Sequence, residues 1–82
     1  MTDSLVLRTS KTIKHFRIIN KLSQEKLAEK AGLDRTYISG IERARRNITL
    51  DSLDKIITAL EVDKKAFFEY VLQEAVDDIS DK

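Results

Sequence analysis

The sequence predicts an all-α fold, a compact five-helix domain spanning residues 1–82. Strand signals are missing, because no sustained alternation of apolar and polar residues occurs and no hairpin dipeptide appears. A pattern that marks helix starts occurs four times instead: an apolar residue, a capping residue, and a second apolar residue four positions after the cap. A length of 82 residues without proline or a Gly/Ser-rich linker fits one domain.

These four patterns place helix starts near residues 24, 35, 50 and 64. The sets are Leu22-Ser23 with Leu27, Leu33-Asp34 with Ile38, Ile48-Thr49 with Leu53, and Val62-Asp63 with Phe67. Before them, a first helix is predicted over residues 5–19, burying Leu5, Ile13 and Phe16. The fourth helix is predicted over 50–60 and the last over 64–77.

The second and third helices, within residues 24–43, are the centre of the prediction. Leu27, Ala28 and Ala31 recur at helical spacing and give the second helix an apolar face. Gly32 can take the left-handed conformation that closes a helix, and Asp34 is a strong N-cap for the next one. Two short helices joined by a tight glycine turn predict a helix-turn-helix.

The outer face of the third helix favours nucleic acid as its ligand. Ile38 and Ile41 mark the inner side, whereas Arg35, Thr36, Ser39 and Arg43 fall on the opposite side. A plain helical bundle could share this geometry. However, an inert solvated face usually mixes Glu with Lys, and this one carries no carboxylate. Its side chains are those that meet phosphates and base edges in a major groove.

Five positions in this region carry a resemblance to a known family. They are Gln24, Ala28, Gly32, Ile38 and Ile41, where the Cro/phage-repressor (XRE) family of helix-turn-helix proteins keeps its Gln, Ala, Gly and two buried aliphatics. The likeness covers roughly residues 10–62 and implies a lambda-repressor-like fold. The run LDRTYISGIERARRN (33–47) more closely resembles the controller proteins of restriction–modification systems.

The controller resemblance implies a homodimer that binds palindromic operators in double-stranded DNA, and the lack of a signal-peptide or membrane-spanning pattern predicts a cytoplasmic location. It would activate and repress its own gene and that of the endonuclease. Phage-type repressors and antitoxins share the fold and remain alternatives. A helical protein-interaction module, with an incidental basic face, is an alternative from another class.

The predicted DNA contacts divide into two sets. Base edges are assigned to Arg35, Thr36 and Ser39, with guanine O6/N7 as the best match for Arg35. Phosphates are assigned to Gln24, Tyr37, Arg43, Arg46, Asn47 and Arg17. The Arg-rich loop after the third helix could instead be a solvated charge run, but beside a helix-turn-helix phosphate contact is the favoured interpretation.

Two residues in this region have competing interpretations. In the Cro-like family an arginine at the position of Arg17 pairs with a glutamate, here Glu42; it could also reach a phosphate, or do both. Gly40 lies inside the third helix, where glycine costs about 0.5–1 kcal/mol relative to alanine. Close approach to DNA or to another helix is the expected compensation, and a tolerated defect is the alternative.

The charge is divided between the two halves of the chain. Residues 1–46 have a net charge of +6 and residues 47–82 a net charge of −5, which suggests one surface for a polyanion and another for something else. The absence of cysteine excludes disulfides and thiolate catalysis. With one histidine, His15, and no Gly-rich phosphate loop, no enzyme activity, metal site, cofactor or small-molecule substrate is predicted. No signal peptide or membrane span is visible.

The last helix is apolar on more than one face, and a domain this small cannot cover it alone. It could simply wrap the first helix. The preferred interpretation is a two-fold homodimer. Its predicted interface residues are Ile48, Leu50, Phe68, Val71 and Leu72.

Overall fold

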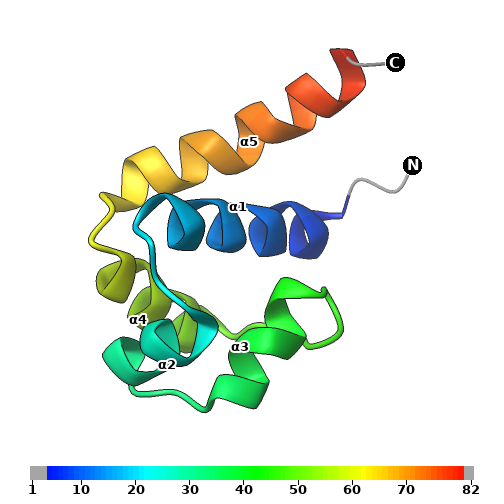
Figure 1. Ribbon diagram of the computed structural model, residues 1–82. Coiled ribbons are helices and arrows are strands. Elements are labelled where there is room, and N and C mark those ends of the chain that lie inside the picture. The colour runs from blue at the N-terminus through cyan, green and yellow to red at the C-terminus, as the bar shows by residue number, and fades with distance from the viewer. Residues whose placement is uncertain (1–3, 81–82) are drawn as a thin grey trace.

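Five helices make up the part of the chain that the computed structural model describes, the backbone of residues 4–80 and the side chains of residues 4–73. They are α1 (Leu5–Ile19), α2 (Gln24–Ala31), α3 (Arg35–Glu42), α4 (Leu50–Leu60) and α5 (Lys64–Ser80) (Figure 1). The predicted starts at 24, 35, 50 and 64 are confirmed. The last helix continues to Ser80, past the predicted end at residue 77.

Side-chain capping hydrogen bonds are present at three of the four predicted helix starts, and also at Ser4, which was not predicted as a cap. The side-chain oxygens of Ser4, Ser23 and Thr49 each accept a hydrogen bond from the backbone N–H three residues later, at 2.9–3.0 Å. Asp63 Oδ2 does the same for Ala66 at 3.2 Å. Asp34 is the N-cap of α3, as predicted, and has the extended backbone of that position, but its side chain makes no capping hydrogen bond.

The first four helices end in the same backbone geometry, with a residue in the left-handed conformation. These residues are Lys21, Gly32, Ala44 and Glu61, with φ between 58° and 71°. In each case the next N–H bonds back to a carbonyl five positions earlier, as in Arg45 N to Gly40 O at 2.8 Å. This is the Schellman arrangement. Only one of the four residues is a glycine, so the other three ends would not be recognised from composition.

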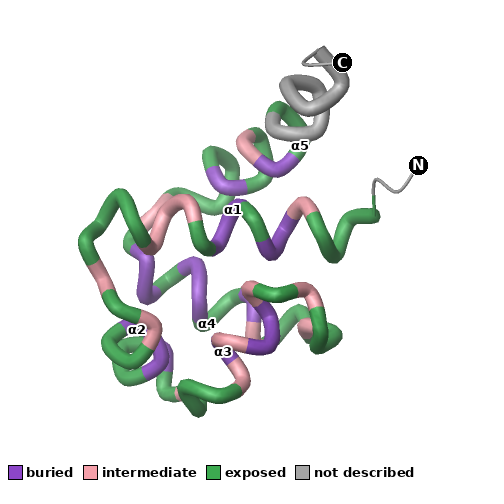
Figure 2. The backbone as a smooth tube through the Cα atoms, turned by 45° about the vertical axis from the view of Figure 1, so that its right-hand side comes forward, coloured by how far each residue is buried: buried purple, intermediate pink, exposed green. Residues whose placement is uncertain are grey.

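The core is formed by apolar residues from all five helices, including Ile13, Leu27, Ile38, Ile56 and Phe67. α1 packs on α5 and crosses over α3 and α4, while α2 packs against α3 and α4 (Figures 1 and 2). The staple residues Leu22, Leu33, Ile48 and Val62 pack on the edge of this core. The packing therefore holds the helix-turn-helix against two other helices.

Leu5 corrects the prediction for α1. It was expected in the core, but it is 64% exposed, whereas Ile13 is fully buried and Phe16 packs against the core. Leu5 lies in the first turn of α1 and faces an apolar groove described below. His15 is half-buried, because its ring stacks on that of Tyr70 at a centroid distance of 4.2 Å.

Candidate DNA interface

The exposed face of α3 carries the three residues predicted to read bases. Ile38 and Ile41 are buried, at 0% and 1% exposure, and so fix which side of the helix faces inward. Arg35 and Thr36 are exposed and Ser39 is half-exposed. Because positions i, i+1 and i+4 lie on one side of a helix, the three side chains share a surface. No carboxylate interrupts that face between Arg35 and Ser39.

Below this face, a buried ion pair joins α1 to the end of α3. Arg17 Nε donates to Glu42 Oε2 at 2.7 Å and Arg17 Nη2 donates to Glu42 Oε1 at 3.0 Å. The side chains are 13% and 2% exposed. In a third hydrogen bond, Arg17 Nη1 donates to the backbone carbonyl of Leu22 at 2.7 Å. The predicted Arg17–Glu42 pair is thus present, and phosphate contact by Arg17 remains a prediction.

Gln24, the first residue of α2, is part of the same network. Its Nε2 donates to Glu42 Oε1 at 3.0 Å. This bond fixes the start of α2 relative to the end of α3, and it orients the Gln24 amide. The side chain of Gln24, the predicted phosphate ligand at the N-terminus of α2, is therefore held by the glutamate of the ion pair. The sequence contained no signal for this contact beyond the Gln itself.

The loop after α3 turns back over the helix that precedes it. Arg43, Arg45, Arg46 and Asn47 are all exposed. The Arg46 guanidinium carbon lies 5.9 Å from the centre of the Tyr37 ring. Tyr37 Oη donates a long hydrogen bond of 3.5 Å to the backbone carbonyl of Asn47. Three of the predicted phosphate ligands (Tyr37, Arg46 and Asn47) are thus brought together.

Gly40 is explained by this loop. A Cβ built on Gly40 would lie 2.6 Å from Arg46 Cγ, and the three nearest atoms to it all belong to the Arg46 side chain. Of the two predicted reasons for the glycine, close approach to a neighbouring helix is not what these contacts show, and close approach to DNA stays a prediction. The neighbour is the side chain of a loop residue six positions later, which sequence reasoning did not anticipate.

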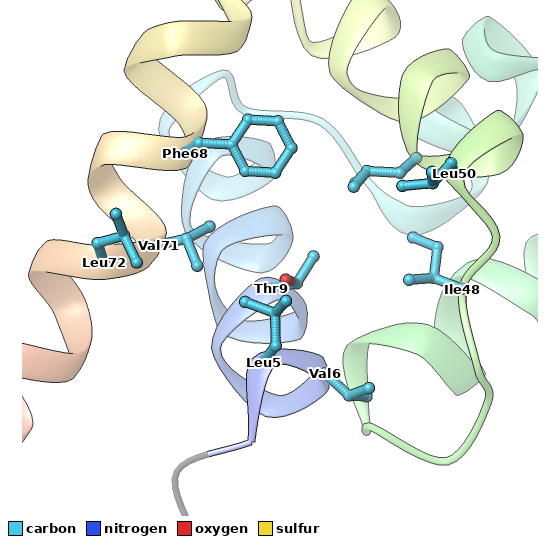
Figure 3. A pocket seen from close by; sticks show the side chains of 9 residues that line it. Leu5, Val6, Thr9, Ile48, Leu50, Phe68, Val71 and Leu72 are labelled. Atoms are coloured by element: carbon cyan, nitrogen blue, oxygen red, sulfur yellow. The ribbon is translucent and has the colours of Figure 1, made fainter.

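A second surface, the apolar groove, lies between α1, α4 and α5. It is lined by Leu5, Val6, Thr9, Ile48, Leu50, Leu53, Phe68, Val71 and Leu72 (Figure 3). Leu50 is 84% exposed, Leu72 60% and Phe68 41%. Four of the five predicted interface residues therefore present apolar surface. Val71 is only 1% exposed; it is a core residue that forms the floor of the groove, because its side of α5 faces α1.

The described residues contain no group of three or more His, Cys, Asp or Glu side chains placed to hold a metal ion. Among the same residues, no helix is long and apolar enough to cross a membrane.

A glycine-turn helix pair with a basic, carboxylate-free outer helix face defines the class of helix-turn-helix DNA-binding domains. Comparison with known proteins agrees: the chain belongs to the helix-turn-helix family, which it matches over residues 13–67. The predicted all-α fold and the predicted family are both confirmed.

Within that family the chain is similar to controller proteins. It is 41% identical over 71 residues to Control protein C.BamHI of Bacillus amyloliquefaciens, a match covering 85% of this chain and 88% of that protein. Against Control protein C.SmaI of Serratia marcescens the identity is 49% over 51 residues, 62% of this chain and 61% of the relative.

Solved structures give the same result. The restriction–modification controller protein C.Esp1396I is 47% identical, with a TM-score of 0.86 over 88% of this chain and 95% of that one. A structure of the same controller as a tetramer in complex with its natural 35 base-pair operator matches with a TM-score of 0.85 at 47% identity. The resemblance predicted from residues 33–47 therefore extends over most of the chain.

Proposed function

We propose that this protein is a sequence-specific, double-stranded DNA-binding transcriptional regulator that acts as the controller of a restriction–modification system. The observation that carries the proposal is the α3 surface. Its buried side is locked in place by Ile38, Ile41 and the Arg17–Glu42 pair, while Arg35, Thr36 and Ser39 face outward. The similarity to a controller solved with its operator supports it.

In this mechanism α3 enters the major groove. Arg35 donates two hydrogen bonds to guanine O6 and N7, and Thr36 and Ser39 contact neighbouring base edges. A rigid helix suits this role because base readout needs side chains held to within fractions of an ångström. The network of Arg17, Glu42 and Gln24 supplies that rigidity at the end of α3.

Phosphate contacts set the register of the helix on the duplex. Gln24, Tyr37, Arg43, Arg46 and Asn47 are assigned to this role, together with the N-terminus of α2, whose dipole favours an anion. Arg17 is assigned chiefly to its pair with Glu42, since its guanidinium already donates three hydrogen bonds within the protein. Each phosphate neutralised adds to the salt dependence of binding.

The apolar groove is assigned to a second copy of the chain, giving a two-fold dimer. Exposed leucines and a phenylalanine in one patch are typical of a protein–protein interface, and a two-fold dimer would bury this same patch on both copies. The two α3 helices of such a dimer would lie about 34–36 Å apart and read a near-palindrome one turn long. Activation at one operator site and repression when a second site fills are implied by the controller family, as are a cytoplasmic location and the lack of a catalytic role.

Selection of bound sites from a random duplex library tests the proposal, with the mass of the protein in solution measured beside it. A two-fold symmetric motif and a dimer mass are expected. A protein-interaction module would yield no enriched motif, and its partner binding would hardly respond to salt, whereas phosphate binding weakens steeply between low and moderate salt.

A further inference from the structure

The Arg46 side chain occupies the space beside Gly40 that a side chain at position 40 would fill. Gly40 is buried within α3, and the three heavy atoms nearest to a Cβ built on it are Cγ, Nε and Cβ of Arg46, at 2.6, 3.6 and 3.7 Å. Glycine lowers helix stability at such a position, so an alanine there would be favoured if nothing occupied the space. What occupies it is an exposed, charged side chain.

Two further contacts place Arg46 here, a backbone hydrogen bond made by Arg45 and the ring of Tyr37. The Arg45 N–H donates to the Gly40 carbonyl at 2.8 Å, which ties the loop to the same residue of α3. The Arg46 guanidinium then lies 5.9 Å from the centre of the Tyr37 ring, one helical turn before Gly40. The stem of Arg46 therefore crosses α3 at Gly40, and its charge is set beside Tyr37.

We propose that Gly40 is a positioning residue for DNA binding, which acts by leaving room for the Arg46 side chain to lie across α3 with its guanidinium held against Tyr37 before DNA arrives. The inference rests on the proposed function, because it concerns a phosphate ligand of that site. A side chain ordered in advance loses less conformational entropy on binding, and an arginine has many rotamers to lose.

A Cβ at position 40 should displace the Arg46 side chain without unfolding the protein. A separation of 2.6 Å is shorter than any contact that a real Cβ makes, so the Arg46 stem must move. Because Arg46 is exposed, it can turn into solvent while α3 and the core stay as they are. The expected signature is weaker DNA binding in a protein that is folded as well as the wild type.

A double-mutant cycle on Gly40→Ala and Arg46→Ala tests the proposal. Affinity is measured for the selected operator and for an unrelated duplex at several salt concentrations. Gly40→Ala should weaken both by about 2–10-fold, the cost of one side chain left unordered. Arg46→Ala should also weaken both alike and reduce the salt slope by about 1. In the Arg46→Ala background, Gly40→Ala should change nothing further.

Two additional variants sharpen the test. Gly40→Ser adds the same Cβ and should behave as Gly40→Ala does. Lys55→Ala removes one exposed positive charge from α4, outside the proposed contacts, and should leave the affinity at the wild-type value. In NMR spectra, the Arg46 side-chain protons should lose their shift from the Tyr37 ring in Gly40→Ala, while the core signals stay in place.

The possible outcomes separate the positioning role of Gly40 from the proposed function. If wild type binds with a steep salt dependence but Gly40→Ala binds equally well, the positioning role is overturned and the proposed function stands. If Gly40→Ala is as harmful with Arg46 absent as with it present, the glycine acts by another route, such as direct backbone approach to DNA, and the positioning role is again overturned. If wild type binds no duplex, both the proposed function and this inference fail.

Discussion

Replacing Arg17 with methionine should destabilise the protein more than the removal of any single exposed contact would. The Glu42 carboxylate is 2% exposed and receives two of its three hydrogen bonds from Arg17. After the change only Gln24 Nε2, at 3.0 Å, still donates to it. The carbonyl of Leu22 also loses its Arg17 donor. Removing one partner of a buried pair typically costs about 3–5 kcal/mol, because the remaining charge is buried without compensation.

A second variant separates the cost of the unpaired Glu42 charge from the cost of lost packing around Arg17. In Arg17→Met with Glu42→Leu both charges are gone, and the free energy of unfolding should return to within about 2 kcal/mol of wild type. Urea unfolding followed by circular dichroism gives these values, provided that the slope with urea is the same for all variants. Two results would refute this reasoning. One is a free energy of unfolding for Arg17→Met within about 1 kcal/mol of wild type. The other is a double variant whose loss of stability equals the sum of the losses in Arg17→Met and Glu42→Leu measured singly.

Two further predictions concern a helix end and the apolar groove. Ala44→Gly should raise the free energy of unfolding by about 0.5–1 kcal/mol. The left-handed conformation of Ala44 (φ 58°) costs about 1–2 kcal/mol, which glycine removes. The greater entropy of glycine in the unfolded chain offsets part of this gain. An unchanged or lowered urea midpoint would show that Ala44 is unstrained. Leu72→Glu should convert a dimer to a monomer in sedimentation and lower operator affinity, whereas Lys65→Glu, exposed on the same helix, should not. A dimer that survives Leu72→Glu would place the interface elsewhere.

Helix starts and the helix-turn-helix were predictable because their signals are local. A cap and its flanking apolar residues act within one turn, so Leu22, Ser23 and Leu27 place the start of α2 without any knowledge of the rest of the fold. The signal of Gly32 is equally local, because the glycine itself takes the left-handed backbone conformation that ends α2. The Arg17–Glu42 pair spans 25 positions, and it was predicted only through the family resemblance.

The features that were missed depend on tertiary geometry. Leu5 is exposed and Val71 buried because each helix is rotated by its neighbours, and the apolar pattern of α1 and α5 does not specify that rotation. Ala44 closes α3 in a conformation that only glycine or asparagine would have signalled. Arg46 reaches Gly40 because of that closure, so the contact could not be inferred from the sequence.

The affinity of wild type and Arg35→Ala for the selected operator, and for operators changed one base pair at a time, tests the central claim most directly. If α3 reads the major groove, Arg35→Ala should cost about 1–3 kcal/mol on the operator and should lose discrimination at one base pair in each half-site, with preferences elsewhere kept. Equal weakening on every duplex, with the full pattern of base preference retained, would contradict the claim that Arg35 and the exposed face of α3 read the sequence.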